Sequence, residues 1–193
     1  MAGNIVIIQG HPDTRAIHFC HALADAYVEG AREGRHEVRR IAVSGVDFPI
    51  LRNREEWESE AVEVGIRASQ VDIAWADHLV IIYPLWLGSM PAILKGFLEQ
   101  VSRPGFAISR SGTGMPRPLL KGKSARIIVT MGMPAPVYRW YFGAHSLKSL
   151  ERNILGACGI KPIHASVVGS VEGSDKHRQT WLARMRELGR KAA

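Results

Sequence analysis

Two side chains that can carry a proton, the Tyr138 phenol and the His145 imidazole, lie in one connection of this 193-residue chain. The connection follows an apolar run at 125–130 and also contains Gly132, whose missing side chain lets a ligand approach the backbone closely. A phenol and an imidazole in one loop are suited to general acid–base catalysis. A buried tyrosine and a helix-capping histidine would give the same pattern, so spacing alone leaves both interpretations open.

A second candidate is the loop at 10–16, which follows an apolar run and precedes a helical pattern. The backbone N–H groups and the dipole of a helix N-terminus attract phosphate, and His11, Thr14 and Arg15 could add contacts. The loop lacks the glycine spacing of a Rossmann fingerprint or a P-loop, and an ordinary turn would give the same residues. His18 and His21 have the spacing of a metal-binding pair, but no suitable carboxylate or cysteine accompanies them, so no metal is expected.

The third candidate is the connection at 83–91, which places Trp86 and bulky apolar residues between Pro84 and Pro91. Connections are normally polar, so a rigid apolar wall with free backbone groups fits a flat heterocycle that has polar edges. The alternative is that Trp86 packs against a neighbouring subunit. The two interpretations are compatible.

The elements that must position these loops alternate along the chain. An α/β fold with one parallel sheet and helices on both faces is therefore expected, as a single domain over residues 1–193. If the strand order is 2-1-3-4-5, ligands bind where that order reverses, beside the ends of the first and third strands. The predicted strands are 4–9, 37–43, 79–83, 125–130 and 163–168. The predicted helices run from about Ile17 to Gly30 and then over 55–74, 91–101, 146–158 and 176–191.

Composition narrows the class of protein further. The chain has 25 Lys plus Arg and 18 Asp plus Glu, which gives a net charge of +7, but the basic residues are scattered and no nucleic-acid motif is present. No stretch is long and apolar enough for a membrane span, and no signal peptide is visible, so a cytoplasmic protein is expected. Cys20 and Cys158 are expected to be reduced packing residues.

The segment PLWLGSMPAILKGF at 84–97 resembles the flavodoxin-like NAD(P)H:quinone oxidoreductases of the DT-diaphorase type. This family includes bacterial quinone reductases and the ancillary flavoproteins of potassium-efflux systems. The resemblance implies a three-layer sandwich with a five-stranded parallel sheet in the order 2-1-3-4-5. It also implies a homodimer with a flavin at the subunit interface.

The same resemblance assigns residues to the flavin. His11 matches the histidine of the first phosphate-binding loop, where the family usually continues with serine and asparagine and this chain has Ala16 and His18. Tyr138 matches the active-site tyrosine and His145 its histidine partner, with a spacing one residue longer than in vertebrate members. The remaining matches are Pro84, Leu85, Trp86 and Leu87 along the isoalloxazine ring, Thr130 and Gly132 at its polar edge, and Glu99 near it.

The resemblance implies a flavoenzyme that passes hydride from NAD(P)H through bound flavin to a quinone-type acceptor. FAD is the expected cofactor, and FMN is the alternative because the chain is shorter than the vertebrate members. Two other functions stay open. One is an azo- or nitroreductase that uses the same site, and the other is a regulatory flavoprotein that associates peripherally with a potassium-efflux transporter.

Overall fold

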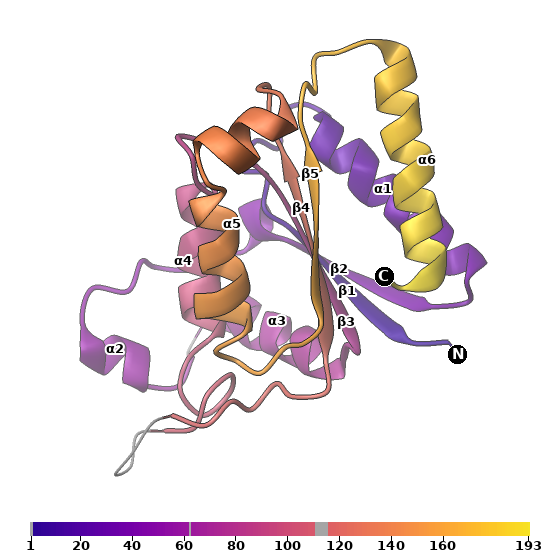
Figure 1. Cartoon of the computed structure of the whole chain (residues 1–193). Helices are drawn as coiled ribbons and strands as arrows, with labels where there is room; N and C mark the ends of the chain where they lie inside the picture. Colours follow the sequence, from indigo (N-terminus) through magenta and orange to yellow (C-terminus); the bar gives the residue numbers. More distant parts are fainter. Residues whose placement is uncertain (1, 62, 111–115) are drawn as a thin grey trace.

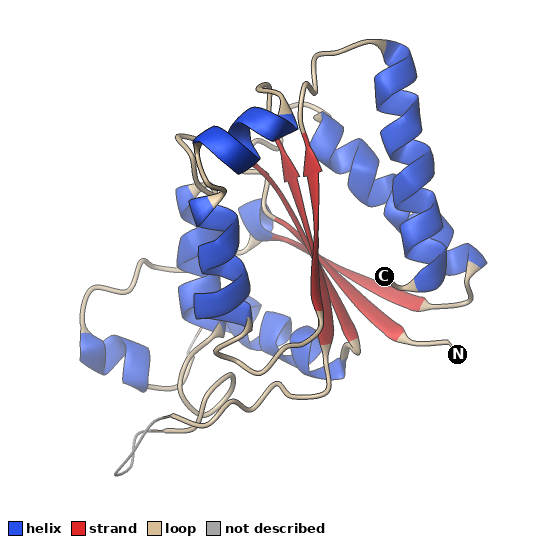
Figure 2. Cartoon of the chain, in the orientation of Figure 1, coloured by secondary structure: helices blue, strands red, loops and turns tan. Residues whose placement is uncertain are grey.

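The computed structural model describes residues 2–61, 63–110 and 116–193. A five-stranded sheet lies in the middle of the molecule, and helices cover both of its faces (Figures 1 and 2). Neighbouring strands pair in parallel, in the order β2-β1-β3-β4-β5, which confirms the predicted α/β three-layer sandwich. The strands are β1 (Asn4–Gln9), β2 (Glu37–Ala42), β3 (His78–Pro84), β4 (Ser124–Thr130) and β5 (Ile163–Val168).

The central strands β1, β3 and β4 are apolar on both sides because helices bury both faces of the sheet. β2 is an edge strand, and its exposed residues include Arg39 and Arg40, whose charges discourage pairing with another strand. The strand predicted at 37–43 ends one residue earlier, because Val43 begins a 3₁₀ turn, Val43–Gly45.

The helices divide between the two faces of the sheet. A Cβ on Gly30 would lie 1.8 Å from the Arg186 carbonyl oxygen, and one on Gly189 would lie 2.0 Å from that of Tyr27, so α1 and α6 cross very closely. On one face lie α1 (Phe19–Glu33) and α6 (Asp175–Lys191); on the other lie α3 (Val64–Trp75), α4 (Ala92–Val101) and α5 (His145–Ser149) (Figure 1).

The helix predicted over 55–74 is wrong in one respect, because the structure has two helices there. They are α2 (Arg54–Glu58) and α3, while Val62 between them lies outside the described residues. The buried guanidinium of Arg103 donates hydrogen bonds to the carbonyl oxygens of Glu56 (2.6 Å) and Ser59 (3.3 Å). In a continuous helix these carbonyl oxygens would accept backbone N–H groups of the next turn. Because they accept from Arg103 instead, this side chain stabilises the break between α2 and α3.

Other helix boundaries also differ from the sequence prediction. α1 begins at Phe19 with His18 as its N-cap, so Ile17 lies outside the helix and is exposed. Pro91 precedes α4 instead of starting it. The helix predicted at 146–158 starts at His145, and after Ser149 it continues as a wider π-type segment, Leu150–Leu155.

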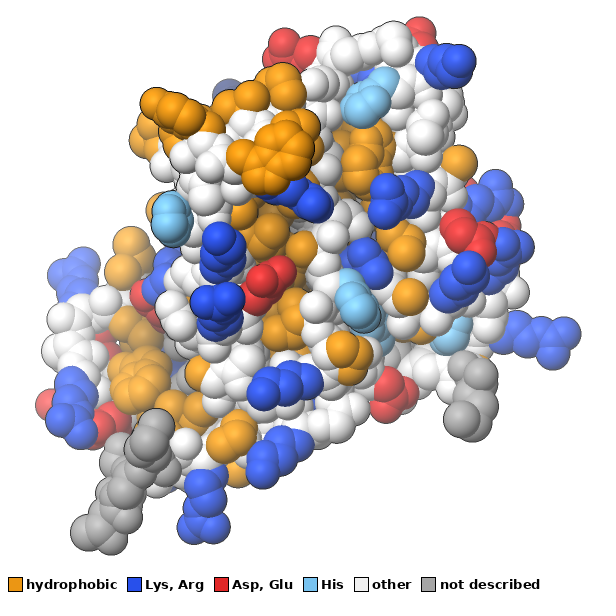
Figure 3. Space-filling model, viewed as in Figure 1, with side chains coloured by type: hydrophobic (Ala, Val, Ile, Leu, Met, Phe, Trp, Pro, Cys, Tyr) orange, Lys and Arg blue, Asp and Glu red, His pale blue; other side chains and the backbone are white. Residues whose placement is uncertain are grey.

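Three composition-based expectations can be compared with the structure. Lys and Arg side chains are scattered over the face shown in Figure 3. Cys20 and Cys158 are both free and buried, as predicted. Over the described part of the chain, no helix has the length and apolar character needed to cross a membrane.

His78 at the start of β3 links the stability of the fold to pH. Its Nδ1 shares a 2.7 Å hydrogen bond with the Ser124 hydroxyl, while its Nε2 is buried without a protein partner. Burial, together with the nearby charges of Arg126, His164 and His36, lowers the pKa of His78 to about 4. The unfolded chain therefore binds a proton that the folded chain excludes between the ordinary histidine pKa and pH 4.

We predict that the free energy of unfolding falls by about 1.4 kcal/mol per pH unit between roughly pH 6.5 and 4 through this group. The His78→Asn variant, which keeps a side chain able to bond Ser124, loses this component of the pH dependence. Urea unfolding at several pH values measures the slope. The exposed His164→Asn variant is the control, and an identical slope in His78→Asn and wild type would contradict the assignment.

Candidate functional site

The carboxyl ends of β1, β3 and β4 meet at one edge of the sheet and enclose a cavity of about 310 Å³. We call it the strand-end cavity. It lies at the point where strand order reverses, which is the place where ligands bind in doubly wound sheets. Seven of the residues predicted from the sequence line it: His11, His18, Pro84, Leu85, Trp86, Thr130 and Gly132.

The first wall is the loop between β1 and α1. His11 is only 6% exposed, and its Nδ1 accepts a 3.2 Å hydrogen bond from the backbone N–H of Asp13. The Asp13 carboxylate accepts from the backbone N–H of Arg15 (2.9 Å) and from its guanidinium, which holds the pKa of Asp13 well below its usual range. These bonds form a tight turn that leads into α1. The first residues of that helix, Phe19 and Cys20, line the cavity, and the first N–H groups of a helix have no carbonyl acceptor in a preceding turn.

The second wall is the turn after β3. The Leu85 N–H donates to the Thr130 carbonyl oxygen (2.7 Å), which extends the β3–β4 pairing beyond Pro84. Trp86 and Ser89 exchange backbone hydrogen bonds of 2.8 and 3.0 Å across a two-residue turn. Trp86 is half-exposed and presents its ring about 6.2 Å from the His11 ring. The apolar wall predicted from the sequence therefore lies beside the first loop.

The third wall is the end of β4. The buried Thr130 hydroxyl lies 3.0 Å from the Cys20 sulfur, which joins β4 to the start of α1. Burial raises the pKa of the Cys20 thiol to about 12, so this cysteine stays protonated and is a poor nucleophile. A Cβ on Gly132 would meet nothing within 4 Å, so the backbone here is open to a ligand.

Tyr138 and His145 do not form the proton-handling pair in the cavity that the sequence predicted. Tyr138 is buried; its phenol oxygen shares a 2.8 Å hydrogen bond with the Ser146 hydroxyl and accepts the Leu147 N–H at 3.3 Å. His145 is exposed, and neither residue lines the strand-end cavity. The structure therefore joins the phenol to Ser146 and not to His145. Their catalytic roles stay a prediction.

Four other predicted cofactor residues also lie outside the strand-end cavity. Thr14 and Ala16 line a neighbouring cavity of about 430 Å³ on the other side of the first loop. Glu99 pairs with Lys95 at a third cavity of about 220 Å³, which Trp57 also lines. Leu87 is fully exposed at the tip of its turn.

The sequence prediction did not assign five further residues to the site: Phe19, Cys20, Met131, Val171 and Glu172. Val171 and Glu172 follow β5, whose carboxyl end lies at the same edge of the sheet as those of β3 and β4. The sequence could have indicated Val171 and Glu172, because every strand of a parallel sheet contributes a loop to this edge.

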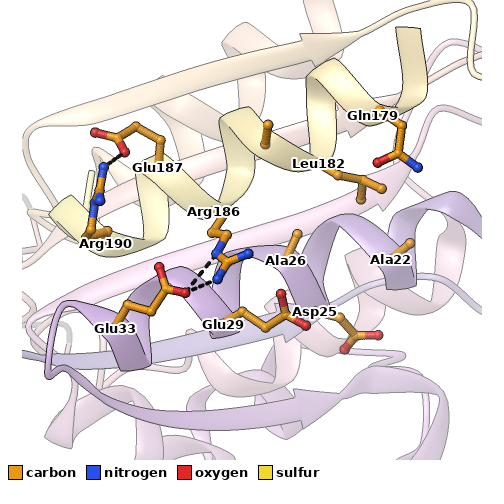
Figure 4. A pocket seen from close by; sticks show the side chains of 11 residues that line it. Ala22, Asp25, Ala26, Glu29, Glu33, Gln179, Leu182, Arg186, Glu187 and Arg190 are labelled. Atoms are coloured by element: carbon orange, nitrogen blue, oxygen red, sulfur yellow. Dashed lines mark hydrogen bonds and ion pairs between the residues drawn. The ribbon is translucent and has the colours of Figure 1, made fainter. Parts of the chain in front are cut away.

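A larger cavity, about 590 Å³, lies between α1 and α6 and is lined mainly by charged side chains (Figure 4). Figure 4 shows Arg186 of α6 pointing to Glu33 of α1, with a 2.8 Å bond from its Nε, and Glu187 paired with Arg190. None of the predicted site residues lines this cavity. The Arg186–Glu33 ion pair joins the two helices, whereas the Glu187–Arg190 pair lies within α6. Over the described residues, no group of three His, Cys, Asp or Glu side chains is placed to hold a metal ion.

Comparison with known proteins agrees with this architecture. A family model described as "Flavodoxin-like fold" matches residues 3–190. The chain belongs to this flavodoxin-like family. An uncharacterized NAD(P)H oxidoreductase of Haemophilus influenzae is 27% identical over 184 residues, which cover 93% of this chain and 90% of that protein. The crystal structure of Smu.1420 from Streptococcus mutans superposes with a TM-score of 0.80 at 28% identity, covering 97% of this chain and 99% of that one.

Other family members carry more specific names. A ribosyldihydronicotinamide dehydrogenase [quinone] of Mus musculus is 29% identical over 69% of this chain, but the match spans only 59% of that protein. An FMN-dependent NADH:quinone oxidoreductase of Burkholderia lata is 36% identical over 61 residues, which are 32% of this chain and 27% of that relative.

Leu87 gives a test of how the site is built. Leu87 and Gly88 have φ values of +47° and +76°, a combination that two-residue turns normally fill with Asn-Gly. A leucine in this left-handed region costs about 1–2 kcal/mol, and its fully exposed side chain buries nothing in return. Backbone strain of this kind is often found at binding sites, and Leu87 directly follows Trp86, which lines the strand-end cavity.

We predict that Leu87→Asn raises the free energy of unfolding of the flavin-free protein by about 1 kcal/mol. Urea unfolding measures the change. Ile17→Asn, at an equally exposed position without positive φ, is the control and is expected to change stability little. A loss of stability in Leu87→Asn would show that the leucine makes stabilising contacts after all.

Proposed function

We propose that this chain is an NAD(P)H:quinone oxidoreductase that binds a flavin in the strand-end cavity. The observation that carries the proposal is the meeting of an anion-attracting helix N-terminus, an apolar aromatic wall and an open stretch of backbone at one strand edge. The names of the family relatives from Haemophilus, Mus and Burkholderia support the same activity.

The residues of the cavity fit a flavin mononucleotide. His11 has an unpaired Nε2 within the described residues and lies beside the N-terminus of α1, which suits the phosphate. Pro84, Leu85 and Trp86 would lie along the isoalloxazine ring, and the backbone at Gly132 would face its polar edge. We propose FMN in place of FAD, because one phosphate site is at hand here and a matching relative is named FMN-dependent.

A bound flavin supplies the redox chemistry, accepting hydride from NAD(P)H and returning electrons to the quinone. The protein's own part is to bind and shield. Trp86 and Leu85 exclude water from one side of the cavity, and the Gly132 backbone can donate to charge at the ring edge. Neither Tyr138 nor His145 lines the cavity, so we propose an indirect role for them: the buried Tyr138 phenol holds a proton that it shares with the partly exposed Ser146 hydroxyl, and His145, the sequence neighbour of Ser146, exchanges that proton.

We predict that Tyr138→Phe lowers the rate at which NAD(P)H reduces the bound flavin by about tenfold or more, while flavin content stays unchanged. The phenylalanine keeps the packing and removes only the hydroxyl that bonds Ser146. Stopped-flow absorbance measures the rate, and steady-state NAD(P)H oxidation with a quinone measures turnover.

The matched control is Tyr141→Phe, which removes a hydroxyl from an exposed tyrosine in the same connection. An unchanged rate in Tyr138→Phe would remove that phenol from the chemistry. A flavin-loaded wild-type protein that oxidises NAD(P)H no faster with a quinone than without one would contradict the proposed activity.

We also propose that the protein is a homodimer. Three neighbouring aromatic side chains, Trp140, Tyr141 and Phe142, are 83%, 82% and 48% exposed. Figure 3 shows hydrophobic side chains gathered at the end of the molecule where α5 begins. Aromatic residues contribute most of the energy of many protein interfaces, so an exposed cluster beside the proposed site supports a second copy as its occupant.

We predict that light scattering gives twice the 21.3 kDa chain mass for the wild type and the single mass for Trp140→Glu. Val71→Glu on α3 changes another exposed apolar residue and is expected to leave the dimer intact. A wild-type protein that stays at the single mass when concentrated would contradict the dimer.

The two free thiols support a reducing compartment, since neither cysteine is used in a disulfide. We propose the cytoplasm on that ground. NAD(P)H, the proposed reductant, is also a compound of the cell interior.

A further inference from the structure

A second cavity, of about 430 Å³, lies across the first loop from the strand-end cavity, and we call it the β2-side cavity. It is found at the carboxyl ends of β1 and β2, on the face of the sheet that α1 covers. His21 lines this cavity and His11 lines the strand-end cavity, and the centroids of the two rings are 5.1 Å apart. At this point a wall no thicker than two side chains separates the cavities.

The side-chain amide of Gln9, the last residue of β1, lines the β2-side cavity without a hydrogen-bond partner among the described residues. Gln9 is only 9% exposed, and its Oε1 atom is fully buried. Buried polar groups nearly always have a partner, so the position of this amide is explained if a ligand bonds to it. A glutamine amide accepts at its oxygen and donates at its nitrogen, and an adenine base offers the matching pair, an amino group beside a ring nitrogen.

The apolar lining of the β2-side cavity suits a flat ring. Ile7 of β1, Ala24 of α1 and Ala42 of β2 contribute apolar surface around the amide. Ile17 also lines the cavity, although its side chain is 88% exposed. A ring that covers Ile17 removes this apolar surface from water, which favours binding.

The charges at the β2-side cavity favour an anion. Among the described residues that line it, two arginines, Arg15 and Arg40, face one carboxylate, Asp25. Arg15 is paired with Asp13 outside the cavity. Arg40 donates from one nitrogen, Nη2, to Asp25 at 2.6 Å, and within the described residues its other guanidinium nitrogens make no hydrogen bond. A guanidinium with free N–H groups matches the oxygens of a phosphate.

We propose that the β2-side cavity binds the adenosine half of NADPH: Gln9 recognises the adenine, and Arg40 binds the 2′-phosphate. In other doubly wound dinucleotide-binding folds, an arginine near the adenosine ribose accepts the 2′-phosphate of NADP. The nicotinamide half then reaches across the first loop to the flavin in the strand-end cavity. The inference rests on the proposed function, because the flavin has to lie in that cavity to accept hydride. It makes NADPH the preferred coenzyme, since NADH has no 2′-phosphate.

The test uses adenosine 2′,5′-bisphosphate, which carries the adenine and the 2′-phosphate but has no nicotinamide to react with a flavin. Titration calorimetry with the purified protein, incubated with FMN beforehand, measures the dissociation constant. We predict that Gln9→Leu and Arg40→Gln each weaken binding about tenfold or more, because each removes hydrogen bonds to the nucleotide. In turnover with a quinone, Arg40→Gln is expected to raise the KM for NADPH about tenfold and to leave the KM for NADH unchanged.

Arg39→Gln is the matched control for Arg40→Gln. Arg39 is the neighbour of Arg40 in β2 and is similarly exposed, but it pairs with Asp72 of α3 at 2.8 Å, on the opposite face of the sheet. This variant is expected to bind the bisphosphate and both coenzymes like the wild type. Gln179→Leu, at an exposed position of α6 outside the cavity, is the control for Gln9→Leu.

The outcomes separate this inference from the proposed function. Equal binding of the bisphosphate by the Arg40→Gln and Arg39→Gln variants, or binding that Gln9→Leu leaves unchanged, would overturn the inference. So would a wild-type protein that reduces a quinone with NADPH but does not bind the bisphosphate, and in that case the proposed function would stand. A protein that binds the bisphosphate through Gln9 and Arg40 but retains no FMN would overturn the proposed function alone.

Discussion

The parallel pairing of β1, β3 and β4 in one register is the constraint on which the strand-end cavity depends. Pro84 pairs with Thr130, so β3 and β4 end together, and Gln9, the last residue of β1, pairs with Ile82 two residues before the end of β3, so the three strands finish close together at one edge of the sheet. The chain leaves β1 toward β2 and returns to β3 on the other side. No crossover therefore covers the crevice between β1 and β3, and the loops that follow the strands are free to form a binding site there.

The sheet also orders these loops beyond the strands. The Gly10 N–H donates to the Ile82 carbonyl oxygen at 2.8 Å, and the Met131 N–H donates to that of Val168 at 2.9 Å. These bonds extend the ladder by one residue into the first and third loops. Loops that continue the hydrogen-bond ladder in this way are held rigidly. A rigid site can keep a planar cofactor, and the substrates that bind beside it in turn, in a fixed geometry.

The sheet and most of the cavity could be predicted from the sequence because buried parallel strands have continuous apolar runs and their carboxyl ends share an edge. Features that depend on distant side chains could not be predicted. The break between α2 and α3 depends on Arg103, which is far along the chain from the carbonyls it binds. The partner of Tyr138 is Ser146 and not His145, because a left-handed Ala144 turns the chain just before α5. The grouping of His18 and His21 with His11 depends on how the first loop folds back.

The measurement that tests the central claim most directly is the visible absorption spectrum of the purified protein after reconstitution with FMN, followed without oxygen while NADH or NADPH is added. A protein that binds flavin in the strand-end cavity and passes electrons through it retains the flavin absorption band through gel filtration, loses it on addition of the nicotinamide and regains it when a quinone is added. Flavin that separates from the protein on gel filtration, or a retained band that does not bleach, would contradict the account.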